Sequence, residues 1–313
     1  MLHIISDDPD GLAGIDQEKM RTVTIGRMKV IKPYRDEMEN KYPWCIAAVP
    51  GKAWAKKVFP DLQVNRAVDA LWDAILKASR ADGPDPVREW ARHNDDLAKR
   101  CDYLNRLGLT ALEYKASNGT DFRVGLLPDA LFMGGGESDL KGRYYNPNIP
   151  SEEIFTSPRA GDADGIVYAT KPLSYQGQLI ENFSVRFEKG KVVEVKAEKN
   201  QELLEKMVSM DEGAAMLGEC ALIAYDSPIN RLGLLFYNTL FDENASCHLA
   251  LGRGFGNCVR GYEDMTNEQL KEYGINDSMI HVDFMIGCKD LGITGITKSG
   301  ERVAIFKDGN WAF

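Results

Sequence analysis

The sequence predicts an α+β or α/β protein in which a partial α/β N-terminal domain, residues 1–108, precedes a strand-rich domain, residues 109–313. Two observations support this division. Strand-like and helix-like apolar patterns alternate in the first part of the chain, as they do in α/β layers. From residue 109 onward, hairpin signals follow one another and few helical patterns occur, which is typical of a strand-rich domain.

The N-terminal part is expected to begin with two short strands and a helix. Short apolar runs at residues 2–5 and 45–49 predict the strands, and a Pro-Gly pair ends the second of them. Apolar side chains recur every three or four positions over residues 64–79, so this segment is predicted to be helical.

Two further helices are predicted. Residues 86–107 should form one, because Asp85 can cap its N-terminus and Gly108 can end it in the left-handed conformation. Another is predicted over residues 201–217, and it is the main helix of the second domain.

Two hairpins dominate the first half of the second domain. Residues 112–117 and 120–124 flank Asn118-Gly119, a strong two-residue turn signal. Residues 183–187 and 191–195 are joined in the same way through a Lys-Gly pair.

The composition indicates a soluble cytoplasmic protein. A net charge of −9 argues against nucleic-acid binding, because phosphate contacts need clustered lysine and arginine. No apolar run reaches the roughly 18 residues that a membrane span needs, and no signal-peptide pattern is present. The six cysteines form no CxxC pair, which predicts reduced thiols in a reducing compartment.

A histidine and a carboxylate stand two residues apart within the apolar run 278–287. If this run is a strand, His281 and Asp283 point to one face, while Ile280, Val282 and Phe284 point to the other. Burying two ionisable groups is costly unless they pair or bind a cation. A structural His–Asp hydrogen bond and a metal site are therefore both open at this point.

Other segments favour the metal site. His248 should share a face with Ser246 and Ala250, which are small enough to leave room beside the imidazole. Glu219 opens an apolar strand, and the pair Glu152-Glu153 opens another. Carboxylates and imidazoles on separate strands suit one or two divalent cations of the zinc, cobalt or manganese type. The pattern alone leaves open which glutamate of the pair takes part.

Three ordered strings resemble the thermophilic metallo-aminopeptidases of the aminopeptidase T, aminopeptidase S and PepS type. They are Asn148–Pro158, Tyr237–Gly252 and His281–Asp283. The resemblance implies metal ligands at Glu153, Glu219, His248, His281 and Asp283. Glu243 matches a further acidic position, either a ligand or the acid/base.

The resemblance also implies a reaction. Two divalent cations about 3.5–4 Å apart would lower the pKa of a water, which attacks an N-terminal peptide bond. Glu219 is expected to bridge the cations, and Glu243 to bind the second cation or to carry a proton to the leaving amine. Peptides with a free N-terminus are the expected substrates, and a homodimer is the expected assembly.

The chain departs from the family pattern at two points. Phe255 stands where the family usually has a tyrosine, at a position expected to contact substrate, so a hydroxyl near the reacting oxygen is missing. Family members also begin upstream of Met1, so the chain is expected to lack the first part of the N-terminal domain. These departures keep two alternatives open: an inactive homologue with a structural metal site, and a metal-dependent hydrolase of another amide.

Overall fold

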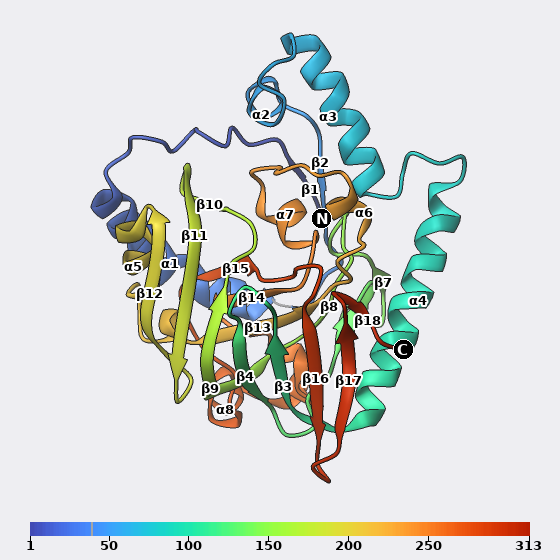
Figure 1. Ribbon diagram of the computed structural model, residues 1–313, viewed down its shortest axis with the longest axis vertical. Coiled ribbons are helices and arrows are strands. Elements are labelled where there is room, and N and C mark those ends of the chain that lie inside the picture. The colour runs from blue at the N-terminus through green and yellow to red at the C-terminus, as the bar shows by residue number, and fades with distance from the viewer. Residues whose placement is uncertain (39) are drawn as a thin grey trace.

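The computed structural model describes residues 1–38 and 40–313, which form a mixed α/β fold with two main antiparallel sheets (Figure 1). This confirms the predicted fold class. One sheet has nine strands and the other has five, and side chains from both sheets belong to one large apolar core. Among the described residues, no helix is long and apolar enough to cross a membrane.

The N-terminal segment forms a small sheet with helices. Strands β1 (Leu2–Ile5) and β2 (Cys45–Ala48) confirm the two strands predicted from apolar runs, and they pair with each other in parallel. Helix α1 (Gln17–Met38) lies between them in the sequence and was not predicted, because Gly26 and Pro33 interrupt a weakly amphipathic pattern. Strand β2 also forms a parallel bridge from Ile46 to Asn148, which ties it to the segment that leads into strand β8 (Ile154–Thr156).

Helices α2 (Lys52–Val58) and α3 (Val64–Ala78) lie together at one end of the molecule (Figure 1). Their buried side chains, among them Trp54 and Leu71, pack with Phe236 and Phe241 from a distant part of the chain. The helix predicted over 64–79 is confirmed, and it packs near the start of strand β14 (His248–Gly252).

Helix α4 (Pro86–Leu107) has the predicted bounds and caps. The Asp85 carboxylate accepts a hydrogen bond from the Arg88 N–H at 3.1 Å, and Gly108 adopts φ 60° and ψ 49°. Buried α4 residues such as Leu97 and Leu104 belong to the large core of the two sheets. The division into domains at residue 108 stays a prediction.

The nine-stranded sheet runs in the order β10-β11-β9-β4-β3-β16-β17-β18, with β12 paired to β11. Its strands are β3 (Leu109–Lys115), β4 (Asp121–Leu126), β9 (Pro158–Tyr168), β10 (Leu173–Tyr175), β11 (Gln178–Glu188), β12 (Lys191–Lys199), β16 (Gly292–Thr297), β17 (Arg302–Lys307) and β18 (Asn310–Trp311). The pairings of β3 with β4 and of β11 with β12 confirm both predicted hairpins.

The five-stranded sheet runs in the order β15-β14-β13-β8-β5. Its strands are β5 (Met133–Gly134), β8 (Ile154–Thr156), β13 (Leu217–Leu222), β14 (His248–Gly252) and β15 (His281–Met285). One face packs into the large core. The other face carries most of the candidate metal ligands.

Short elements connect these strands. They are α5 (Gln201–Val208), α6 (Pro228–Arg231), α7 (Thr239–Glu243), α8 (Asn267–Tyr273), β6 (Glu137–Ser138) and β7 (Tyr144–Tyr145). The helix predicted over 201–217 is wrong in length: α5 ends at Val208, and Leu217 already belongs to β13. Asp211 explains the early end, because its carboxylate accepts hydrogen bonds from the N–H groups of Ala214 and Met279 and turns the chain toward the sheet.

Candidate metal centre

Strand β15 has the two faces that alternation predicts. Val282 and Phe284 are buried in the large core, while His281 and Asp283 lie on the opposite face. The Nε2 atom of His281 lies 3.3 Å from Oδ1 of Asp283. The strand therefore presents an imidazole and a carboxylate together, next to strand β14.

Strand register aligns the other candidates with this pair. Ala250 of β14 stands between Asp283 of β15 and Glu219 of β13, directly opposite both. Because the alanine side chain is a single methyl group, space remains between the two carboxyl groups. The six cysteines of the chain, four buried and two half-buried, are all free thiols, and Cys247 and Cys220 belong to the core, away from this face.

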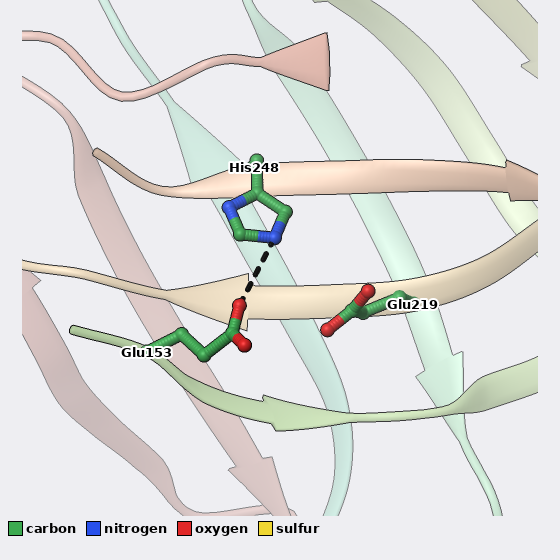
Figure 2. A group of neighbouring side chains, drawn as sticks. All are labelled: Glu153, Glu219 and His248. Atoms are coloured by element: carbon green, nitrogen blue, oxygen red, sulfur yellow. Dashed lines mark ion pairs between the residues drawn. The ribbon is translucent and has the colours of Figure 1, made fainter. Parts of the chain in front are cut away.

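Two groups of side chains could each hold a cation, and Glu219 belongs to both. Glu153, Glu219 and His248 form the first group (Figure 2), and Glu219, His281 and Asp283 form the second. Within each group the candidate ligand atoms lie within 4.8 Å of one another. The shortest approaches are 3.3 Å from His248 Nε2 to Glu153 Oε2 and 3.1 Å from His281 Nε2 to Glu219 Oε2.

Backbone carbonyls orient both imidazoles. The Nδ1 atom of His248 lies 2.9 Å from the Glu243 carbonyl oxygen, and that of His281 lies 2.7 Å from the Arg253 carbonyl oxygen. A proton on Nδ1 donates to these oxygens, which directs Nε2 of each ring toward the carboxylates. Metal-binding histidines are commonly held in this way, because the second ring nitrogen fixes the tautomer.

Burial and mutual charge shift the pKa values of this cluster. Burial raises the pKa of Glu219 to about 7, against the hydrogen bond from His281 that lowers it. Burial alone would lower the pKa of His248, but Glu153 and the other carboxylates raise it to about 9. The pKa of Asp283 falls below its usual range, because the charge of His281 outweighs burial. The carboxyl groups thus repel one another where positive charge would stabilise them.

One buried atom tests whether a cation fits. Oδ1 of Asp283 is buried and has no hydrogen-bond partner, although it faces both imidazoles. A buried carboxylate oxygen without a partner is costly, and a divalent cation would compensate it. Oxygen and nitrogen ligands in this combination suit zinc, cobalt or manganese. The residues present therefore fit a bound metal.

Glu243 reaches the site from helix α7 rather than from a strand. Its side chain is buried near the carboxyl group of Asp283, and its Oε1 accepts a hydrogen bond from Asn244 Nδ2 at 3.4 Å. Burial and the charges of the neighbouring carboxylates raise its pKa well above the usual value. It belongs to neither of the two candidate ligand groups.

Phe255 lies beside the second group. Its ring centroid is 4.9 Å from that of His281 and 5.3 Å from that of Phe155, in a small apolar cluster with Ala221 and Cys258. The ring therefore forms an apolar wall against the imidazole at the position where the resemblance implies a tyrosine.

The sequence pattern left open whether Glu152 or Glu153 takes part in the metal site, and the two side chains point in different directions. Glu153 approaches His248, whereas Glu152 forms a two-bond ion pair with Arg80. Arg80, His93 and Asn244 contact the same segment and were not predicted from the sequence. No pattern signals these contacts, because the partners lie between 58 and 92 residues apart in the chain.

Buried carboxylates and imidazoles gathered on one sheet face are typical of metal-dependent hydrolases. The family model described as thermophilic metalloprotease (M29) matches residues 1–311, and the chain belongs to this family. The resemblance stated from the three sequence strings is thereby confirmed.

Named relatives agree with this membership. Aminopeptidase AmpS of Bacillus subtilis (strain 168) is 42% identical over 313 residues, which are 100% of this chain and 76% of the relative. Aminopeptidase T of Thermus aquaticus is 40% identical over 311 residues, covering 99% of this chain and 76% of the relative. The solved structure of wild-type AmpT from Thermus thermophilus superposes with a TM-score of 0.89 at 37% identity, and covers 100% of this chain and 76% of that one.

Proposed function

We propose that this protein is a metal-dependent aminopeptidase that hydrolyses N-terminal peptide bonds with two divalent cations. The observation that carries the proposal is the position of Glu219, which belongs to both candidate ligand groups. A carboxylate shared between two such groups is suited to bridge two cations. Membership of a metalloprotease family and relatives named aminopeptidases support the same activity.

The proposed ligands divide between two cations, each zinc, cobalt or manganese. Glu153 and His248 would hold the first, His281 and Asp283 would hold the second, and Glu219 would bridge them. When bound, such cations supply a water of lowered pKa and polarise the peptide carbonyl. The carbonyls of Glu243 and Arg253 keep the two imidazoles directed at the site throughout.

Glu243 is proposed either to complete the ligands or to carry a proton. Its carboxyl group lies beside Asp283 at the end of α7, so it can approach substrate from outside the sheet. In the second role it would take a proton from the attacking water and give it to the leaving amine. Phe255 would contact substrate through its ring, because it lies beside His281.

The charge of the site supports peptides with a free N-terminus as substrates. A protonated or metal-binding α-amino group would be stabilised among several carboxyl groups, whereas an acetylated one would not. We further propose a homodimer in the cytoplasm. The family resemblance supports the dimer, and the six free cysteines support a reducing compartment.

Phe255 favours a second candidate, a non-catalytic protein that keeps the metal as structure. The side chain has no hydroxyl that could donate to a reacting oxygen, and it packs tightly between two rings. A hydrolase of another amide remains the third possibility, since it would use the same ligands.

Activity measurements on the reconstituted full chain separate these functions. Metal content is measured after cobalt, zinc or manganese loading, and turnover is measured on aminoacyl p-nitroanilides and on their N-acetylated forms. We expect two ions per chain and hydrolysis of the free-amino substrates only. Normal metal content without turnover would support the structural role, and equal cleavage of acetylated substrates would support another amide hydrolase.

A further inference from the structure

We propose that Arg80 is a positioning residue for the metal centre, acting through Glu152 on the neighbouring Glu153. Arg80 Nε donates to Glu152 Oε1 at 2.8 Å, and Arg80 Nη2 donates to Oε2 at 2.7 Å. Such paired bonds fix the direction of both groups, because the guanidinium and carboxylate are planar. The proposal rests on the proposed role of Glu153 as a metal ligand.

Two more side chains hold the backbone at the same place. His93 Nε2 lies 2.7 Å from the Ser151 carbonyl oxygen, and the Glu152 N–H donates to Asn244 Oδ1 at 2.7 Å. We call Arg80, His93 and Asn244 the Glu152 clamp. Its members come from the end of α3, from α4 and from the end of α7, so three elements meet on two consecutive residues.

Glu153 needs such support because the sheet does not hold it. The pairing of β8 with β13 begins at Ile154, so Glu153 stands just before the first residue in the ladder. From this position just before the strand, its carboxylate must nevertheless lie close to His248 and Glu219. The direction in which the chain enters β8 therefore decides where that carboxylate lies, and the clamp sets this direction.

The backbone conformation of Arg80 also supports a role for its side chain. Arg80 adopts a positive φ of 53°, which residues other than glycine rarely do. A glycine would fit this turn better and would lack the guanidinium. The ion pair is also partly buried, with the Arg80 side chain 25% exposed and that of Glu152 8% exposed. Partly buried paired bonds of this kind orient their partners more strongly than exposed ion pairs do.

Metal affinity is the measurement that separates positioning from a merely structural ion pair. Arg80→Lys keeps the charge and loses the paired bonds, and Glu152→Gln keeps the shape and the Asn244 contact. At a temperature where circular dichroism shows both variants folded, we expect one cation per chain to bind about 10–100-fold more weakly, the usual effect of outer-shell changes. The turnover number should fall with little change in KM.

Arg231→Lys is the matched control. Arg231 lines the same pocket and pairs with Asp226, and among the described residues no hydrogen bond or ion pair joins it to Ser151, Glu152 or Glu153. Its metal affinity and turnover should equal those of the unchanged protein. If Arg80→Lys and Glu152→Gln also bind both cations with unchanged affinity, the positioning role is refuted.

Glu153→Gln distinguishes this failure from failure of the proposed function. If Glu153→Gln retains both cations, Glu153 is not a ligand and the proposed site itself is wrong. If Glu153→Gln loses a cation while the two clamp variants keep normal affinity and turnover, the site stands and only the clamp is refuted. Loss of affinity in all three variants supports both.

Discussion

Nε2 of His281 lies 3.1 Å from Oε2 of Glu219, which places one carboxyl group between the imidazole of β15 and the His248 group of β14. The two residues are 62 positions apart in the chain. Sheet register joins them, because Ala250 stands opposite Glu219 on one side and opposite Asp283 on the other. Removing the charge of Glu219 should therefore affect both candidate ligand groups at once.

Glu219→Gln should bind fewer than two cations per chain. Its turnover number should fall by a factor of at least about 10², which is the usual effect of removing one stabilising group at a reacting centre. The substitution preserves shape, so folding should be little changed. Glu202→Gln, on the exposed side of α5, is the control and should behave as the unchanged protein. Metal analysis and turnover at saturating substrate measure both. Full stoichiometry and normal turnover in Glu219→Gln would exclude the bridging role.

The two faces of β15 predict opposite effects for neighbouring substitutions. His281→Ala and Asp283→Ala should lower metal occupancy, because both side chains lie on the metal face, which is the face of the five-stranded sheet that carries the candidate ligands. Val282→Ala should keep the metal and lower the free energy of unfolding by about 1–2 kcal/mol, since buried methyl groups are removed. Chemical denaturation and metal analysis of the three variants check this. Metal loss in Val282→Ala without loss of stability would contradict the assigned faces.

Phe255→Tyr should raise turnover more than it changes KM. A hydroxyl added beside His281 would meet negative charge on the carbonyl oxygen, which is larger in the transition state than in the bound substrate. The variants are compared at equal metal loading and saturating substrate. If packing against Phe155 leaves the new hydroxyl without a hydrogen-bond partner, the protein should become less stable and its turnover should not rise. That result would show that position 255 does not take the role of the family's tyrosine in this protein.

The stability of the metal-free protein should decrease as pH rises from about 6.5 to 9. His248 has a folded pKa raised from 6.5 to about 9, so its stabilising contribution is complete below 6.5 and is lost as pH rises through 9. Glu219, raised from 4.5 to about 7, acts in the same direction at lower pH. Asp283, whose pKa is lowered, changes stability only in acid.

Added metal should reverse this trend, because cations compete with protons for the same atoms. Thermal unfolding between pH 6 and 9, with chelator or with zinc, measures both effects. We expect the difference in melting temperature between the two series to widen as pH rises. A constant difference would show that the cations do not bind at the imidazoles.

The metal face could be predicted from sequence because strand alternation depends only on neighbouring residues. His281 and Asp283 were placed on one face in this way, and β14 obeyed the same rule for His248. Glu243 was different. It lies in the short helix α7, whose five residues are too few for a periodic pattern, so the sequence did not show how it reaches the site.

The Arg80–Glu152 pair and the length of α5 depend on contacts between residues far apart in the chain, and local sequence patterns carry no information about such contacts. The Arg80–Glu152 pair spans 72 residues and depends on the turn that ends α3. The early end of α5 likewise depends on the hydrogen bond from the Met279 N–H to the Asp211 carboxylate, across 68 residues. Propensity alone favoured a longer helix there, and tertiary contacts overrode it.

The order of strands in the five-stranded sheet has a consequence for biosynthesis. Glu153, Glu219 and His248 have all been synthesised once β14 is complete, whereas His281 and Asp283 follow only with β15. A nascent chain stalled after Gly252 would therefore contain every residue of the first ligand group but only Glu219 of the second. The second group can hold a cation only after β15 has been synthesised, so the two ligand groups become complete in a fixed order.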